Sequence, residues 1–208
     1  MDVKEFVAER MSKIKFLGRW KYDVEVSDPS LKPYLNVRGW LVPKTAGRYQ
    51  KKRFGRSMIP IIERLIGRLM VPGHFGKKHK FTSYVASGKY YKNLRIVVKA
   101  FEIIENKTKQ NPIKVLVKAI ENAAPREEIT TIEAGGSRYP KAVDISPLRR
   151  IDLALRFIVW GAYHRSRNKN KKMYEALAEE IINAYNNSTD SFAIQKKLEL
   201  ERIAASSR

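Results

Sequence analysis

Two adjacent glycines divide a run of β-branched residues, and a helix start follows directly. Residues 128–133 have strand character, and Gly135-Gly136 can adopt the positive φ angles of a tight hairpin turn. The returning segment contains Pro140, which cannot donate to a strand ladder and therefore suits an edge strand. Ser146-Pro147 then matches a helix start, with serine as the cap and proline at the first helical position. We therefore predict a two-stranded arm over residues 127–145, joined directly to a helix.

Helical periodicity dominates the rest of the chain. In the helix after the arm, the apolar residues Leu148, Ile151, Leu155, Ile158 and Ala162 repeat at spacings of three and four, which predicts one buried face. Similar spacing occurs elsewhere. The predicted helices cover 57–70, 90–107, 112–123, 147–162 and 173–185, with a last helix capped at 190 or 191 and a short one over 6–16.

These patterns predict a mainly α fold. The expected architecture is a bundle of about six helices with a protruding two-stranded β-hairpin arm and a basic N-terminal extension. We expect the extension to comprise residues 1–55 and the helical domain, arm included, to comprise residues 56–208. The 43% hydrophobic content is enough to supply a core, so the chain is not a disordered basic tail.

Charge points to a polyanionic partner. The chain has 42 Lys and Arg against 21 Asp and Glu, a formal net charge of +21. Such an excess repels itself and is neutralised well by nucleic acid, because phosphate contacts also release condensed counterions. Between Arg38 and Lys80 we count twelve cations and one acid, Glu63. In residues 44–56 a tyrosine and a phenylalanine are interleaved with cations, so phosphates and stacked bases can both be contacted; a solvated linker is the alternative.

Two further groups of cations stand out. Lys92, Arg95 and Lys99 form a basic stripe on the outer face of the helix over 90–107. Residues 164–172 are predicted to form a loop that carries five cations and no acid. Tyr139, near the tip of the arm, has little core around it and is as suited to contact with RNA or protein as to packing.

Several classes of protein are disfavoured. The chain has no cysteine, which excludes disulfides, thiolate zinc sites and cysteine nucleophiles. Its N-terminus lacks the apolar core of a signal peptide, and no apolar run approaches the length of a membrane span. We therefore expect a cytoplasmic protein without a membrane partner.

No catalytic or metal-binding constellation emerges. His74 and His79 are too few for a metal site without further ligands. Asp152 has arginines three residues before and four residues after it, so an ion pair within its own helix is expected. Glu127 and Glu128 lie on an exposed arm and cannot converge as nuclease carboxylates do. We predict no enzyme activity, no cofactor and no metal.

Motifs spread over much of the chain resemble the small-subunit ribosomal protein S7 family. They are carried by residues 111–116, 125–128, 143–150 and 191–197, in the family's order and with plausible spacing. Residues 45–54 resemble the archaeal and eukaryotic branch. The resemblance covers roughly residues 45–208, although residues 71–88 look longer than their family counterpart.

The resemblance implies a function as well as a fold. It implies a structural constituent of the small ribosomal subunit that binds the 3′ major (head) domain of the ribosomal RNA and nucleates head assembly. The arm is then expected to reach toward the exit-site transfer RNA and the messenger RNA exit path. Other implied partners are the neighbouring head and platform proteins, without a homo-oligomer. A free RNA-binding regulator or chaperone is the alternative, and an RNA-processing enzyme is a third.

Ribosomal RNA can be recognised by its shape and its 2′-hydroxyls, so binding requires no catalysis by the protein. The distribution of charge and the resemblance together predict the residues that contact the RNA. They are Arg48, Lys51, Lys52, Arg53, Arg56, Lys77, Lys78, Lys89, Lys92, Arg126, Arg138, Lys141, Arg149, Arg150, Arg165, Arg167, Lys169, Lys171 and Lys172.

Overall fold

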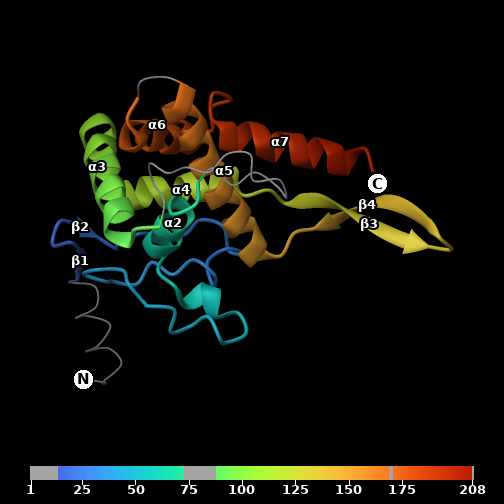
Figure 1. Cartoon of the computed structure of the whole chain (residues 1–208), viewed down its shortest axis with the longest axis horizontal. Coiled ribbons are helices and arrows are strands. Elements are labelled where there is room, and N and C mark those ends of the chain that lie inside the picture. The colour runs from blue at the N-terminus through green and yellow to red at the C-terminus, as the bar shows by residue number, and fades with distance from the viewer. Residues whose placement is uncertain (1–13, 73–87, 169–170, 208) are drawn as a thin grey trace.

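The structure is a computed structural model that describes residues 14–72, 88–168 and 171–207. A helical body carries a two-stranded arm, as Figure 1 shows, so the predicted mainly α architecture is confirmed. Its elements are β1 (Lys15–Phe16), β2 (Trp20–Lys21), η1 (Gly55–Met58), α2 (Ile61–Leu69), α3 (Tyr90–Thr108), α4 (Pro112–Ala123), β3 (Glu127–Ala134), β4 (Ser137–Asp144), α5 (Pro147–Asn168), α6 (Met173–Tyr185) and α7 (Phe192–Ala205).

The helices α3, α4, α5 and α6 pack around one apolar core, with α6 in contact with the other three. The predicted buried faces are confirmed for most positions. On α5, Ile151, Leu155, Ile158 and Ala162 are fully buried, while Leu148 at the start of the helix is half-buried. At the start of α4 the Asn111 side chain accepts the backbone N–H of Ile113 at 3.0 Å, which is the predicted cap.

Helix α2 begins later than the sequence pattern predicted. We expected a helix over residues 57–70, but a 3-10 turn ends at Met58 and α2 begins at Ile61. Pro60 is the cause, since the residue before a proline is pushed out of the helical region. Ile59 is accordingly extended, with φ −77° and ψ 131°. The expected inward face of Ile61, Leu65 and Leu69 is fully buried.

The segment before residue 37 belongs to the same core as the helices. Phe16, Trp20 and Leu31 are buried, and Phe16 stacks on Trp20 with ring centroids 5.7 Å apart. The helix predicted over residues 6–16 is wrong for Lys15 and Phe16, which form β1, and the remaining part lies mostly outside the described residues. A tight turn with positive φ at Leu17 and Gly18 folds β2 back and brings the two aromatic rings together.

The arm is confirmed in its strands and its turn. Strands β3 and β4 pair antiparallel over eight residues each, from Glu127 opposite Asp144 to Ala134 opposite Ser137. Gly135 and Gly136 form the turn with φ of 58° and 77°. Such angles are strained for other residue types, so the glycine pair sets the position of the turn.

Helix α7 lies beside the base of the arm, and both extend from the body in the same direction (Figure 1). Two hydrogen bonds join them. The N–H of Ala142 donates to the carbonyl of Ser207, just after α7, at 3.4 Å. The N–H of Arg126 donates to the Glu201 carboxylate at 3.0 Å. The tip is different, since Tyr139 is 58% exposed and Ile132 is 41% exposed. The arm is therefore supported at its base and free of the body at its tip.

Two helical glycines differ in the space around them, which yields a stability prediction. A Cβ on Gly161 in α5 would lie 2.7 Å from Cδ of Glu180 and 2.8 Å from Cβ of Phe192. We expect Gly161→Ala to lower the free energy of unfolding by about 1–3 kcal/mol, as overpacking does. Nothing lies within 4 Å of the corresponding position on Gly67 in α2.

The matched control is Gly67→Ala, which should raise the free energy of unfolding by about 0.5–1 kcal/mol because alanine favours the helix. Urea unfolding of both variants checks the prediction. Similar effects of the same sign would show that α5, α6 and α7 are not packed this closely at Gly161.

Candidate nucleic-acid interface

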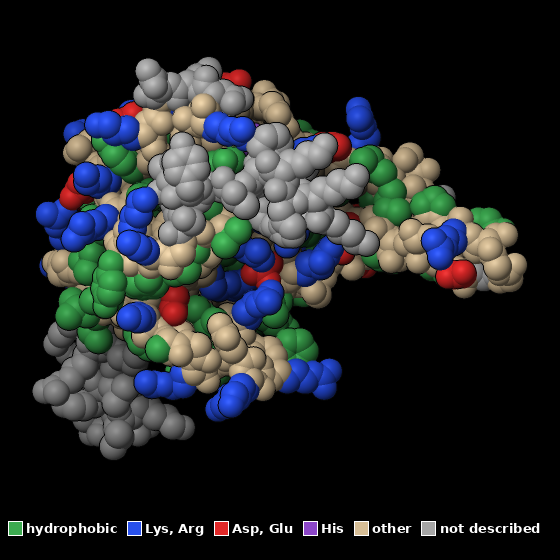
Figure 2. Space-filling view, in the orientation of Figure 1, with side chains coloured by type: hydrophobic (Ala, Val, Ile, Leu, Met, Phe, Trp, Pro, Cys, Tyr) green, Lys and Arg blue, Asp and Glu red, His purple; other side chains and the backbone are tan. Residues whose placement is uncertain are grey.

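Lys and Arg side chains are spread over the face of the body shown in Figure 2, and fewer lie on the arm. Among the predicted contacts, fourteen of those on described residues are exposed. They are Arg48, Lys51, Lys52, Arg53, Arg56, Lys89, Lys92, Arg126, Arg138, Lys141, Arg149, Arg167, Lys171 and Lys172. Lys77, Lys78 and Lys169, like His74 and His79, lie outside the described residues.

Residues 48–56 fold into consecutive turns that display their cations. The segment is anchored just before it begins, because the backbone N–H and hydroxyl of Thr45 both donate to the Glu63 carboxylate of α2 at 2.9 Å. Near its end the backbone of Gly55 packs against the carbonyl oxygen of Tyr49. Only glycine fits there, because a Cβ would lie 1.8 Å from that oxygen. Next to this contact Phe54 is 58% exposed, with the Arg53 guanidinium 5.2 Å from its ring centroid. An exposed aromatic ring among cations suits base stacking beside phosphate contacts.

Asp152 is surrounded by arginines from outside its own helix. Its carboxylate lies 2.6 Å from Nη1 of Arg56, 3.1 Å from Nη2 of Arg64 and 3.9 Å from Nη2 of Arg68. The expected ion pair within α5 was therefore wrong in its partners, because the packing of α2 on α5 brings closer guanidinium groups. One carboxylate faces three cations, and this Asp152 cluster keeps a net positive charge.

Burial and charge act in opposite directions on the Asp152 cluster. Burial alone would raise the pKa of Asp152, but the charges and hydrogen bonds of Arg64 and Arg56 outweigh it and lower this pKa. Burial lowers the pKa of Arg64 and of Arg68, and Asp152 offsets part of that effect. The buried Nε of Arg64 has no hydrogen-bond partner among the described residues. Arg156 adds further positive charge beside Arg68.

The neighbouring arginines Arg149 and Arg150 have different environments. Arg149 is exposed, and its Nε and Nη2 donate to the two carboxylate oxygens of Glu128 on the arm at 2.6 and 2.7 Å. Arg150 is buried at 8% exposure, and its guanidinium donates to the Pro125 carbonyl, the Ser30 hydroxyl and the Asp28 carboxylate. Arg150 therefore holds the N-terminal segment against the base of the arm and does not present its charge to solvent.

The basic loop predicted over residues 164–172 is largely helical. Helix α5 continues to Asn168, so the loop prediction was wrong for residues 164–168. Packing against α6 explains the extension, since Arg165 turns toward Glu179 and Glu180 at 3.5 and 3.2 Å. Lys171 pairs with the same Glu179 at 2.9 Å but stays exposed, as do Arg167 and Lys172. Part of this positive charge is therefore neutralised inside the protein.

Sequence reasoning missed cations that the fold brings to the interface. Arg68 and Arg156 join Arg56 only because α2 packs against α5. The sequence places Lys44 in a basic stretch, but only the tertiary structure places its Nζ 5.0 Å from the ring centroid of Tyr91. For Arg95 the sequence did carry a signal, because its spacing from Lys92 and Lys99 puts the three cations on one face of the helix.

The described residues contain no group of three or more His, Cys, Asp or Glu that could hold a metal ion. The Glu128 carboxylate accepts hydrogen bonds from Arg149. None of the helices in the described part of the chain is long and apolar enough to span a membrane.

Comparison with known proteins decides the family. The model of the family described as ribosomal protein S7p/S5e matches residues 33–208. The chain is also 63% identical over 197 residues to small ribosomal subunit protein uS7 of Nanoarchaeum equitans (strain Kin4-M), which covers 94% of this chain and 100% of that protein. This chain belongs to the ribosomal protein S7p/S5e family. The resemblance seen in the sequence is confirmed, and the match begins twelve residues earlier than the motifs suggested.

Membership of the S7p/S5e family explains the excess of positive charge on the surface. The chain is a structural protein of the small ribosomal subunit and not an enzyme. It therefore works within the ribosome, where it binds ribosomal RNA and contacts neighbouring ribosomal proteins. The exposed cations on residues 48–56 and along α3, together with the half-buried Arg68 and Arg156 near Asp152, are its candidate RNA contacts.

Proposed function

We propose that this protein binds the 3′ major domain of small-subunit ribosomal RNA and nucleates assembly of the subunit head. The observation that carries the proposal is the convergence of residues 48–56 and the Asp152 cluster at the junction of α2 and α5. There, Arg56 joins an exposed basic segment to a group of arginines with a single carboxylate. Ribosomal RNA supplies closely spaced phosphates in an irregular shape, which such a surface fits better than a regular duplex.

The arm has a different role in this proposal. Its two cations, Arg138 and Lys141, are accompanied by Glu133, and Glu133 lies 3.8 Å from Arg138. The arm therefore contributes little net charge to affinity. Its rigid base beside α7 and its exposed tip suit placement, and we propose that it reaches toward the exit-site transfer RNA and the messenger RNA exit path.

Binding to a transcript of the head domain, measured against salt, tests the proposal. We expect tight binding that prefers this transcript to an unrelated structured RNA of equal length, and hydroxyl-radical protection confined to the head domain. The variant Arg56→Ala/Arg68→Ala/Arg156→Ala should reduce the slope of log K against log salt by up to about 2.7, since each phosphate contact contributes about 0.9. A chain that binds both RNAs equally would instead act as a general RNA chaperone.

Shortening the arm should separate placement from affinity. We expect replacement of Ile132–Tyr139 by Asn-Gly to leave the midpoint of thermal unfolding nearly unchanged, because the removed side chains are largely exposed. Head-domain RNA affinity should change less than threefold, while protection of the exit-site region should be lost in reconstituted subunits. A loss of cooperative unfolding would show that the tip supports the body.

A further inference from the structure

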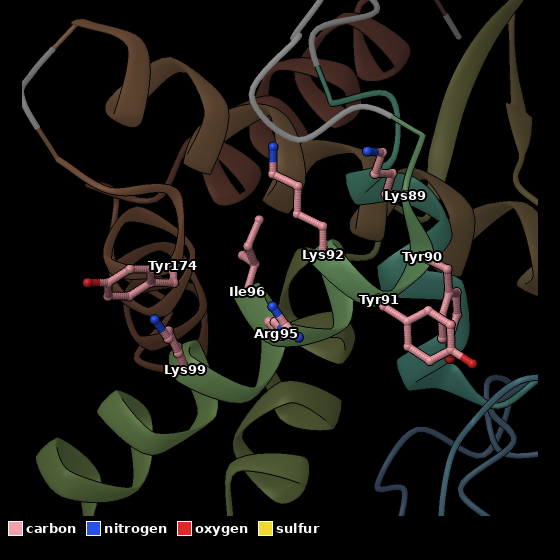
Figure 3. Close-up of a pocket in the computed structure, with 8 residues that line it drawn as sticks. All are labelled: Lys89, Tyr90, Tyr91, Lys92, Arg95, Ile96, Lys99 and Tyr174. Atoms are coloured by element: carbon pink, nitrogen blue, oxygen red, sulfur yellow. The ribbon is translucent and has the colours of Figure 1, made fainter.

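A groove along α3 lies apart from the junction of α2 and α5. Its volume is about 610 Å³, within the range of sites that hold small ligands. The groove is lined from α3 and the residue before it by Lys89, Tyr90, Tyr91, Lys92, Arg95, Ile96 and Lys99, and from α6 by Tyr174. Figure 3 shows the α3 side chains along one stretch of the helix, with Tyr91 toward one end and Tyr174 facing Lys99 at the other.

The cations of the groove follow a single helical face. Lys89, Lys92, Arg95 and Lys99 are separated by three, three and four residues, which places them in one row. At about 1.5 Å per residue the row extends over about 15 Å. The described residues that line the groove include no aspartate or glutamate, so this row has no carboxylate beside it within the groove.

Aromatic rings stand at both ends of this row. Tyr91 is 60% exposed and meets Tyr90 edge to face, with ring centroids 5.5 Å apart. Tyr90 is fixed in turn, because its hydroxyl donates to the Pro43 carbonyl. At the other end the half-buried Tyr174 lies 5.3 Å from Nζ of Lys99. A reachable ring thus sits beside cations at each end of the groove.

We infer that this groove binds a short single-stranded stretch of RNA. Bases stack on Tyr91 and Tyr174, and the intervening phosphates are contacted by Lys92, Arg95 and Lys99. Cations that track a backbone between aromatic platforms are the usual means of holding single strands without reading their sequence. The inference rests on the RNA-binding role proposed above and adds a second, single-strand-specific site to it.

An acidic protein segment would also be attracted by the cations, but the aromatic rings favour RNA. A carboxylate-rich peptide has no flat group that could stack on the ring at each end of the row. Each nucleotide, in contrast, carries both a charged phosphate and a flat base. The two partners therefore differ in their dependence on Tyr91, and an experiment can separate them.

The full-length protein and fluorescently labelled hexauridylate provide the test, by fluorescence anisotropy over a range of salt concentrations. We expect Tyr91→Ala to weaken binding about tenfold without changing the salt slope, because stacking involves no counterion release. Tyr91→Phe keeps the ring and should stay within twofold of the wild type. Lys92→Ala/Arg95→Ala should lower the slope by about 1.4, at about 0.7 per contact with a single strand. Lys21→Ala/Lys114→Ala is the matched charge control, since both lysines are exposed outside the groove and outside the proposed RNA contacts, and it should leave hexauridylate binding unchanged.

Three results would overturn the inference. They are absence of hexauridylate binding to the wild type, wild-type affinity in both Tyr91→Ala and Lys92→Ala/Arg95→Ala, and equal competition by an octaglutamate peptide that is insensitive to Tyr91→Ala. None of them bears on the head-domain transcript, whose binding is measured separately. Loss of preference for that transcript would remove the proposed function and leave the single-strand site in place.

Discussion

Replacing Asp152 by asparagine is expected to lower the free energy of unfolding by about 3–5 kcal/mol, the usual cost of leaving one partner of a buried ion pair uncompensated. The stranded charge is that of Arg64, whose side chain is 4% exposed. Arg64 can then keep only its hydrogen bond to the Tyr34 carbonyl at 3.2 Å and a weaker amide contact. Because Asp152 also contacts Arg56 and Arg68, its loss adds repulsion between three guanidinium groups at the junction of α2 and α5.

Chemical unfolding at neutral pH measures this effect, and Glu102→Gln is the matched control. It makes the same chemical change in a pair whose side chains, Arg19 and Glu102, are 59% and 42% exposed. Such exposed pairs contribute about 0–1 kcal/mol, so the control should change little. Equal effects of the two substitutions would show that Asp152 does not compensate a buried charge.

Acid titration gives an independent check on Asp152. Its pKa in the folded protein lies below the ordinary value, so the carboxylate stabilises the fold fully above about pH 4. This stabilisation is lost as the pH falls through the lowered pKa. The difference in stability between wild type and Asp152→Asn should therefore be constant near neutral pH and shrink below about pH 4. A difference that grows on acidification would contradict the assignment.

Replacing Arg150 by alanine should cost about 2–4 kcal/mol of folding free energy, because its charged hydrogen bonds are buried. Its guanidinium reaches the Pro125 carbonyl at 3.1 Å, the Ser30 hydroxyl at 2.6 Å and the Asp28 carboxylate at 3.1 Å. These contacts join the end of α4 and the N-terminal segment to α5. Their loss leaves buried polar groups of both segments unsatisfied.

Arg149→Ala is the natural control, since it removes an adjacent arginine with an exposed, bidentate partner, Glu128. Its effect on thermal unfolding should be within about 1 kcal/mol. The two substitutions should have the opposite order of effect on the salt dependence of RNA binding. Arg150→Ala, measured where the variant is folded, should leave the salt slope unchanged, whereas Arg149→Ala should reduce it by at most about 0.9. A reduced slope for Arg150→Ala would place this residue at the RNA.

Much of the fold could be predicted because the signals were local. The glycine pair, the helix start at Ser146-Pro147 and the cap at Asn111 each act within a few residues of the chain. The spacing of apolar residues on α3 and α5 indicates which face of each helix is buried, and it does so without any knowledge of the packing partner. The delayed start of α2 was also a local effect, and Pro60 was the overlooked signal.

The candidate interface was less predictable, because a cation's availability depends on its neighbours in space. The sequence shows Arg149 and Arg150 as one pair and Arg165 as part of a basic loop. The fold buries Arg150, turns Arg165 toward Glu180 and brings Arg68 to Asp152, 84 positions further along the chain. Charge counts do not contain these distances.

The sequence by itself determined the family, the arm, the helical faces and the excess of positive charge, because motifs, periodicity and composition need no long-range contact. Only the tertiary structure decided which cations remain available to RNA. Desolvation and Coulomb interactions act through space over a few ångströms, so a guanidinium becomes a structural tie or an exposed contact only once the helices have packed.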